Sequence, residues 1–353
     1  MHEFAGQDER RLTLRFAGGA SAQIVVTTPV NVGAVLVQAT GSEQHLAELS
    51  SHASARGFSL SGAALWRGSE FVSTPDEESL YGALGLPFIA PELREGQGEV
   101  EAGVRGQLPR LLELGDLRGF LHCHTKYSDG SNTVEQLAGA CRDAGYQYVG
   151  ITDHSQAAAY AGGLTSDDLL RQADEIDEVN SRLEGIRVLK GVEADILGDG
   201  RVDFEEHVLA RLDFVIASIH SRFNMSASEM TNRMLNAIEN PHLTIIGHPT
   251  GRLLLSRDPY GLDLDAIIEK AAAHDVALEI NADPHRLDLD WRVLRRVRAG
   301  GAMVSIGADA HSIAGIGHVE FGVGMARKGW LGPDDILNTL SAEGFAAYAR
   351  RRR

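Results

Sequence analysis

Histidines and carboxylates recur in this sequence at the points where apolar segments end. Nine such residues share this position: His122, His124, Asp129, His154, Glu193, His220, His248, Asp309 and His311. Residues two apart on a strand point to the same side, so His122 and His124 are expected to face one space, as are Asp309 and His311. Imidazole nitrogens and carboxylate oxygens are typical metal ligands, and one zinc-like ion takes about four to six of them. The nine residues therefore indicate two or three divalent cations.

The alternative for each residue alone is an ordinary polar group at a strand end. The chain has 14 histidines, so some of them are expected at such positions by chance. The other eight fall mostly in predicted helices or loops: His2, His45, His52, His207, His242, His274, His285 and His318. An unliganded cluster would also crowd imidazoles and carboxylates with nothing to organise them. The recurrence at consecutive strand ends favours the metal site.

The elements that must position these residues begin near residue 118. Apolar runs typical of buried parallel strands occupy residues 119–124, 148–154, 187–193, 213–220, 243–248, 276–281 and 302–311. Helical patterns separate several of them, at residues 133–145, 166–185, 226–240 and 264–275. This alternation predicts an α/β barrel or a doubly wound sheet. In a parallel barrel the carboxyl ends of the strands surround the active site, so the nine residues are expected to meet at one mouth.

The region before residue 118 has a different pattern. Residues 12–16 and 22–28 are expected to form short strands, and residues 42–56 a helix with Ser42 at its start. Residues 31–39 fit either a helix or a strand. A polar, glycine-rich stretch follows at 91–103. We expect a small α+β domain over residues 1–95, a linker over 96–117 and an α/β domain over 118–353.

Composition narrows the class of protein. The chain has 353 residues, 43% of them hydrophobic and 23% charged, which fits a globular protein and excludes a disordered or fibrous one. Its formal net charge of −16 disfavours tight sequence-independent binding of nucleic acid. Two cysteines, Cys123 and Cys141, are too few for a disulfide framework. With no signal peptide pattern and no long apolar run, the expectation is a cytoplasmic protein that does not bind membranes.

Seven motifs occur in an order that resembles the PHP (polymerase and histidinol phosphatase) superfamily. They are HCHTKYSDG (122–130), ITDHS (151–155), GVEADI (191–196), ASIHSRF (217–223), GHPTGRLLL (247–255), EINADPHRLDLDW (279–291) and ADAHS (308–312). The pattern is most similar to the PHP domain at the C-terminal end of bacterial family X DNA polymerases. The resemblance implies a distorted (β/α)7 barrel with three metal ions.

The resemblance also implies a ligand set. The first ion would be held by His122, His124, Glu193 and Asp309. The second would share Glu193 as a bridge with His220 and His248, and the third would take Asp129, His154 and His311. We expect Glu193, Asp309 and His311 to act in catalysis. Mn²⁺ is the expected cofactor, with Zn²⁺ or Fe²⁺ as alternatives.

The implied activity is phosphoester hydrolysis, which the residues also allow. Closely spaced cations lower the pKa of water and neutralise phosphoryl oxygens, so no serine or cysteine nucleophile is needed. Basic residues that follow the strands are candidates for binding substrate phosphate: Lys126, Arg222, Arg252, Arg257 and Arg286. Each of them fits an exposed loop charge equally well.

Residues 39–61 and 76–102 resemble the end of the palm and the thumb of the same polymerases. Two residues differ from the family pattern: Gln23 stands where the family has a catalytic aspartate, and Leu46 replaces an asparagine of the thumb motif. The earlier part of the palm, which would supply the other two catalytic aspartates, does not precede residue 23 in this sequence. We therefore expect a phosphoesterase for DNA ends, a 3′→5′ exonuclease or 3′-end phosphatase, without polymerase activity and with DNA-repair proteins as partners.

Two other functions compete with this one. The first is a phosphatase of small metabolites, as in the histidinol phosphate branch, which the acidic charge favours. The second is a non-catalytic scaffold in DNA repair, against which the complete ligand set argues. Activity against DNA ends and against small phosphomonoesters distinguishes the three.

Overall fold

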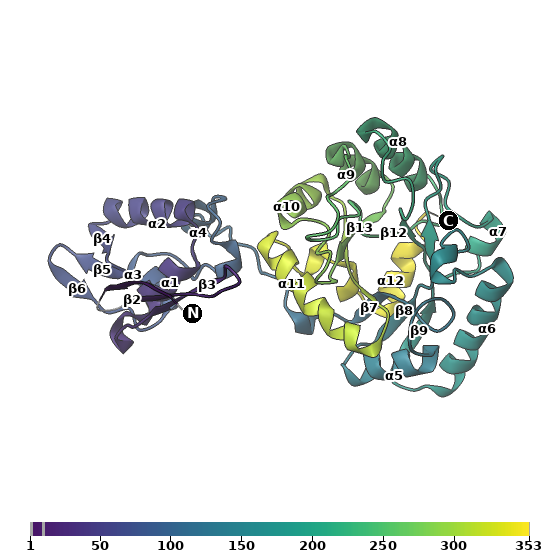
Figure 1. Cartoon of the computed structure of the whole chain (residues 1–353), viewed down its shortest axis with the longest axis horizontal. Coiled ribbons are helices and arrows are strands. Elements are labelled where there is room, and N and C mark those ends of the chain that lie inside the picture. Colours follow the sequence, from purple (N-terminus) through teal and green to yellow (C-terminus); the bar gives the residue numbers. More distant parts are fainter. Residues whose placement is uncertain (1–2, 9–10, 353) are drawn as a thin grey trace. The chain divides into compact units, whose positions relative to one another are not determined.

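The computed structural model describes residues 3–8 and 11–352. The chain divides after Leu108 into two compact units, coloured purple to blue and blue to yellow in Figure 1. The boundary falls inside residues 96–117, the segment expected to be a linker. The first part of that segment forms α4 (Glu99–Val104), which packs against α2 (Glu43–Ala55) and so belongs to the first unit.

The first unit combines two small antiparallel sheets with four helices. Its strands are β1 (Glu3–Asp8), β2 (Arg11–Arg15), β3 (Ser21–Val25), β4 (Phe58–Ser61), β5 (Ala64–Arg67) and β6 (Glu70–Val72). The helices are α1 (Val32–Thr40), α2, α3 (Glu77–Ala83) and α4. In α2, Ser42 caps the first turn, and burial of His45, Leu49 and Ala53 at a spacing of four gives the helix its inner face. The sequence pattern of residues 31–39 fits either a helix or a strand, and in the structure most of these residues lie in α1.

The second unit is built on eight parallel strands. These are β7 (Gly119–Cys123), β8 (Tyr148–Ile151), β9 (Arg187–Lys190), β10 (Glu193–Asp195), β11 (Ile216–Ser218), β12 (Ile245–Ile246), β13 (Ala277–Asn281) and β14 (Val304–Ala310). Only Gly191 and Val192 separate β9, which pairs with β8, from β10, which pairs with β11. If β9 and β10 are counted as one strand, the barrel has seven strands, and the pairing of β14 with β7 completes the ring (Figure 1). The expected distorted (β/α)7 barrel is confirmed.

Helices surround the barrel, each following a strand in the chain. They are α5 (Val134–Asp143), α6 (Ser166–Arg182), α7 (Glu206–Leu209), α8 (Ala227–Ile238), α9 (Leu264–Ala273), α10 (Trp291–Gly300) and α11 (Val319–Lys328). Capping boxes at Thr133, Thr165 and Ser226 fix the first turns of α5, α6 and α8. Among the described residues, no helix has the length and apolar character of a membrane-spanning segment.

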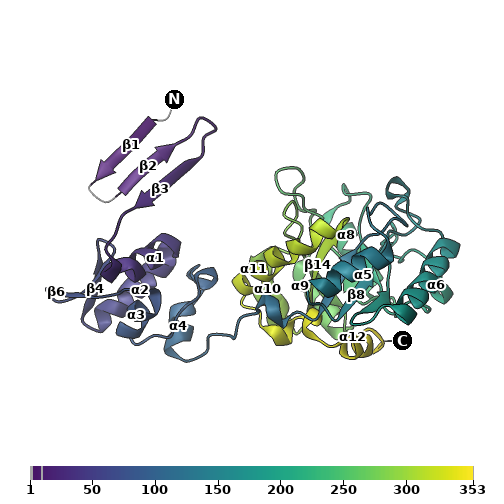
Figure 2. The same cartoon turned by 90° about the horizontal axis from the view of Figure 1, so that it is seen from below.

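The amino-terminal end of the barrel is filled by side chains. The last helix, α12 (Ala342–Ala349), places Phe345 against Phe214 and Tyr148 in one buried cluster with interior strand residues such as Leu189. This packing occupies the end of the barrel where the strands begin, and Figure 2 shows α12 at one edge of the second unit. The polar residues at the carboxyl ends of the strands lie beyond it.

Candidate metal centre

The nine candidate ligands converge at the carboxyl end of the barrel strands. Three groups have ligand atoms that all lie within 4.8 Å of one another. They are His122–His124–Glu193–Asp309, His124–Asp129–His154–His311 and His154–Glu193–His220. The ninth residue, His248, places Nε2 2.9 Å from Glu193 Oε1, and its ring centroid lies 5.1 Å from that of His220. Two histidines, His124 and His154, each belong to two groups, an overlap that the ligand set drawn from the sequence does not contain.

A local break in strand geometry turns two of these residues toward the mouth. His122 and Asp309 have φ values of 64° and 50°, in a region that non-glycine residues rarely occupy. The pairing of β14 with β7 shifts register at this point, between Gly307 and Ala310. As a result Leu121 packs in the barrel interior while its neighbour His122 joins the cluster above it. The prediction that His122 and His124 face one space assumed that side chains alternate strictly along the strand. This alternation does not hold between Leu121 and His122.

Glu193 lies at the centre of the cluster and is fully buried. Its Oε1 is 3.3 Å from His122 Nε2 and 3.4 Å from His220 Nε2, and its Oε2 is 2.9 Å from His154 Nδ1. Burial opposes the charge of this carboxylate, but the surrounding imidazoles outweigh burial and hold its pKa well below the usual range. Glu193 is therefore an ionised carboxylate within reach of several imidazoles, as a bridging ligand has to be.

The histidines of the cluster differ in their affinity for protons. Burial opposes the charge of His220, yet Glu193 and Asp195 raise its pKa to about 10. Burial also opposes the charge of His311, and Asp129 and Asp309 raise its pKa to about 9. For His248, burial and the nearby Arg286 guanidinium lower the pKa to about 4. Because a metal ligand must be deprotonated, cations that bind here have to displace protons from His220 and His311.

Unpartnered buried atoms indicate that the cluster is suited to cations. Among the described residues, five buried atoms of the cluster make no hydrogen bond of acceptable geometry: His122 Nε2, His124 Nδ1, His154 Nδ1, His248 Nδ1 and Glu193 Oε2. Two of them, His154 Nδ1 and Glu193 Oε2, lie only 2.9 Å apart. Buried polar atoms without partners are costly and rare in folded proteins. A mixed set of imidazole nitrogens and carboxylate oxygens suits Mn²⁺, Zn²⁺ and Fe²⁺. The residues present therefore fit a metal centre.

Side chains behind the candidate ligands hold them in orientation, and none of these supporting residues was predicted from the sequence to belong to the site. Glu279 Oε1 lies 2.5 Å from His122 Nδ1, and its Oε2 accepts from the backbone N of His248 at 2.6 Å. Asp195 Oδ1 lies 2.6 Å from His220 Nδ1, and Asn281 Nδ2 donates to Asp309 Oδ2 at 3.2 Å. Such contacts fix the orientation of an imidazole and raise its basicity as a ligand. A signal exists in the sequence, since Glu193-x-Asp195 and Glu279-x-Asn281 repeat the spacing of His122-x-His124.

Asp153 anchors the loop that carries Asp129. It accepts from the backbone N of Thr125 at 2.7 Å, from Thr125 Oγ1 at 2.7 Å and from Gln172 Nε2 of α6 at 2.6 Å. Ser128 Oγ also donates to Asp153, at 2.5 Å. The buried Asp153 thereby fixes residues 125–129 relative to α6.

The basic residues expected to bind substrate occupy different environments. Arg286 reaches the cluster, with Nε 3.4 Å from Asp309 Oδ2 and its buried Nη1 without a hydrogen-bond partner in the described chain. Arg252 donates instead to the carbonyl oxygens of Arg286 and Leu287 and to Asp290 Oδ2, so its charge is engaged in holding the loop that carries Arg286. Lys126 and Arg222 are exposed. The guanidinium of Arg257 stacks on Phe223 at 4.1 Å.

Tyr160 lies beside the cluster and was not singled out from the sequence. Its ring centroid is 6.3 Å from that of His154 and 6.4 Å from that of His220. Partial burial of the hydroxyl, together with Glu193 and Asp195, raises its pKa to about 12. Tyr160 is therefore uncharged at neutral pH.

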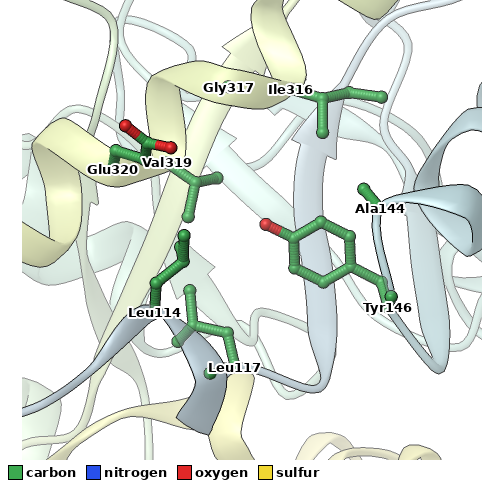
Figure 3. A pocket seen from close by; sticks show the side chains of 10 residues that line it. Leu114, Leu117, Ala144, Tyr146, Ile316, Gly317, Val319 and Glu320 are labelled. Atoms are coloured by element: carbon green, nitrogen blue, oxygen red, sulfur yellow. The ribbon is translucent and has the colours of Figure 1, made fainter.

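A separate pocket lies outside the barrel, near the carboxyl end of α5. It has a volume of about 500 Å³ and is lined mainly by apolar residues, among them Leu114, Tyr146 and Val319 (Figure 3). Glu320 is the one titratable carboxylate in its lining, and none of the nine candidate ligands contributes to it. The pocket therefore offers no catalytic constellation.

Two regions of the chain match known protein families. Residues 35–95 match the DNA polymerase beta thumb, and residues 121–283 match the PHP domain. The "DNA polymerase/3'-5' exonuclease PolX" of Bacillus subtilis is 40% identical over 349 residues, which is 98% of this chain but only 61% of that protein's length. A "Probable phosphatase" of Caldicellulosiruptor bescii is 30% identical over 65% of this chain and 94% of its own length.

A crystal structure of histidinol phosphate phosphatase from Lactococcus lactis matches with a TM-score of 0.43 at 16% identity, over 59% of this chain and 93% of that one. The sequence matches, the barrel and the ligand cluster at its mouth agree with one another. The chain, with a polymerase beta-type thumb domain before its barrel, belongs to the PHP family of metal-dependent phosphoesterases.

Proposed function

We propose that this protein hydrolyses phosphate esters at the ends of DNA, as a 3′→5′ exonuclease or a 3′-end phosphatase. The observation that carries the proposal is the presence, in one chain, of a polymerase beta-type thumb at residues 35–95 and a barrel whose mouth gathers nine candidate ligands. The B. subtilis relative, which bears both a polymerase and an exonuclease name, aligns with 98% of the chain. A domain related to a DNA-binding thumb favours DNA over a small metabolite as the substrate.

The cluster would hold up to three divalent cations, with Mn²⁺ as the first candidate and Zn²⁺ or Fe²⁺ as alternatives. Glu193 is the proposed bridge, because it lies within 3.4 Å of imidazole nitrogens from four histidines: His122, His154, His220 and His248. His124, Asp309, Asp129 and His311 complete the set. Bound cations would supply Lewis acidity toward the phosphate ester and toward the attacking water.

The chain's own residues would prepare the site in three ways. Glu279 and Asp195 hold the Nδ1 atoms of His122 and His220, which leaves the Nε2 atom of each ring directed at Glu193. Arg286 places a guanidinium next to Asp309, where it would pair with phosphate oxygens. His311 is the most exposed of the nine ligands, with 41% of its side chain accessible, and would meet the substrate first. We assign catalysis to Glu193, Asp309 and His311 together.

A second candidate is the hydrolysis of a small phosphomonoester. The "Probable phosphatase" of C. bescii matches over 94% of its own length but over only 65% of this chain. The net charge of −16 also disfavours a long polyanion as substrate. In this case the thumb domain would take no part in substrate binding.

A comparison of substrates tests the proposal. The full chain, loaded with Mn²⁺, is assayed on labelled oligonucleotides with a 3′-hydroxyl or a 3′-phosphate and on p-nitrophenyl phosphate. His154→Ala removes a candidate ligand, and His207→Ala, an exposed histidine of α7, is the matched control. We expect processing of DNA ends by the wild type and by His207→Ala, and its loss in His154→Ala. Turnover of p-nitrophenyl phosphate without any action on DNA ends would overturn the proposal in favour of the second candidate.

A further inference from the structure

Tyr160 is the most exposed tyrosine among the described residues of the barrel unit. Its side chain is 73% accessible, whereas Tyr146, Tyr148, Tyr260 and Tyr348 are all buried. An aromatic ring in water forgoes the favourable burial of its apolar faces. At the rim of a site, such a ring is available to a ligand that brings an apolar face of its own.

The segment that carries Tyr160 is held in place. The backbone N of Ala157 donates to Asp203 Oδ2 at 3.0 Å, and that of Ala158 donates to Ser155 O at 2.9 Å. Gly162 then takes a left-handed conformation, with φ 69°, and ends the turn. Ala158 and Ala161 on either side are buried, so Tyr160 projects outward from an anchored turn.

We propose that the ring of Tyr160 is the stacking platform for the base of the terminal nucleotide, an inference that rests on the proposed action on DNA ends. A nucleotide carries its base and its phosphate on one sugar. A base stacked on a ring 6.3 Å from His154 therefore leaves the phosphate within reach of the ligand cluster. Stacking tolerates any base, since every base has a π-face.

The charges around Tyr160 fit the same occupant. Arg286, next to Asp309, and Arg257, stacked on Phe223, both lie close enough to Tyr160 to interact with its hydroxyl electrostatically. Guanidinium groups pair with phosphate oxygens, and an uncharged phenol ring does not repel a polyanion. Glu193, Asp195 and Asp129 also act on the hydroxyl, so the neutral ring adjoins both the candidate metal ligands and two cations that can pair with phosphate oxygens.

Binding to DNA with and without a terminal base tests the inference. The probes are two fluorescein-labelled single-stranded oligonucleotides, identical except that one ends in a normal 3′ nucleotide and the other in a tetrahydrofuran abasic residue. Both probes carry a phosphorothioate at the terminal linkage to slow hydrolysis, and fluorescence anisotropy is measured in the presence of Mn²⁺ on the full-length wild type, Tyr160→Ala and Tyr160→Trp. Phe321→Ala removes another exposed aromatic ring, on α11, and is the matched control.

We expect Tyr160→Ala to weaken binding of the normal end about 5- to 50-fold and binding of the abasic end less than about twofold. Tyr160→Trp should retain wild-type preference for the normal end, and Phe321→Ala should leave both affinities unchanged. Equal effects of Tyr160→Ala on the two probes, or none, would overturn the inference. If the wild type still processes DNA ends in that case, the proposed function stands without it. A wild type that does not act on DNA ends would reject both.

Discussion

Among the described residues, a cluster of buried histidine and carboxylate occurs in each unit, and the two clusters are built differently. In the first unit, His45 Nδ1 lies 2.7 Å from Glu99 Oε1, and His45 Nε2 lies 3.1 Å from the hydroxyl of Tyr81. Glu99 also accepts from the backbone N of Gly96 at 2.8 Å and of Gln97 at 2.7 Å. Every ring nitrogen and carboxylate oxygen of this pair has a partner.

The cluster at the barrel mouth leaves atoms of the same kinds without hydrogen bonds, although several lie close to one another. Four of its ring nitrogens and one oxygen of Glu193 are buried and make no hydrogen bond within the described residues. A completed network such as His45–Glu99 stabilises a fold, because each buried polar atom keeps its hydrogen bonds. An incomplete network of metal-ligating groups is instead suited to a bound ion. The difference in hydrogen bonding, and not the residue types, distinguishes the histidines of the two clusters.

The largest difference between the clusters should appear when the central carboxylate of the barrel loses its charge. Glu193→Gln should lower phosphoester hydrolysis by more than about 100-fold, since loss of a direct ligand exceeds the usual effect of its supporting residues. His248→Ala removes a ligand from the edge of the cluster and should cost less, with better rescue by excess Mn²⁺. Turnover of p-nitrophenyl phosphate by both metal-loaded variants measures this. Wild-type activity in Glu193→Gln would exclude Glu193 from the site.

A smaller effect is expected from Glu279→Gln, which removes the charge behind His122 and leaves the nine ligands intact. Metal affinity should fall about 10- to 100-fold, because the imidazole loses its orienting carboxylate. Competition with a chromophoric chelator measures this affinity directly, without reference to turnover. The matched control is Glu269→Gln, an exposed glutamate of α9, which should bind metal as the wild type does. Unchanged affinity in Glu279→Gln would show that the hydrogen bond to His122 has no bearing on metal binding.

In the first unit the same type of substitution should affect stability alone. Glu99→Gln places an amide where two backbone N–H groups require an acceptor, and we expect a loss of about 1–3 kcal/mol in local stability. Hydrogen exchange of peptides from α2 and α3, followed by mass spectrometry, reports this loss. Glu101→Gln, on the exposed side of the same helix, is the control and should change little. Altered metal content in Glu99→Gln would contradict the separation of the two clusters.

The smallest effect concerns pH. Burial opposes the charge of Glu99, but its bonds to His45 and to backbone N–H groups outweigh burial and hold its pKa below the ordinary value of 4.5. The stability that this carboxylate contributes is therefore complete above pH 4.5 and is lost as the pH falls below that value. The stability gap between wild type and Glu99→Gln should narrow on acidification from about pH 6 to about pH 3.5. Hydrogen exchange corrected for intrinsic rates measures this difference in local stability. A difference that grows on acidification would contradict the prediction.

Much of the barrel follows from its sequence. Buried parallel strands have continuous apolar runs, so the runs at 148–154 and 276–281 correspond to β8 and β13. The convergence of the nine residues could be predicted because each follows a strand end, and strand ends of a parallel barrel meet. Glu279 escaped notice because it lies inside the apolar run of β13 and not at its end.

The first unit was harder to predict. Strands β4, β5 and β6 are only three or four residues long and partly exposed, so they lack the continuous apolar pattern. Helix α4 lies in a polar stretch that was expected to be a linker, and the buried Glu99 that begins it pairs with His45, 54 residues earlier. Contacts between distant polar residues leave no periodic signal. The shift in register at Asp309 is invisible for a similar reason, since backbone geometry there depends on the packing of β14 against β7.

We propose that the cluster at the barrel mouth, with its incomplete hydrogen bonding, is a multinuclear metal centre. Its most direct test is elemental analysis of the full chain, purified without chelator, equilibrated with Mn²⁺ and dialysed. We expect about two to three ions per chain in the wild type and in His207→Ala, and fewer in Glu193→Gln. A wild-type protein that retains only traces of metal would contradict the proposal, and would leave the nine residues as a polar cluster without a cofactor.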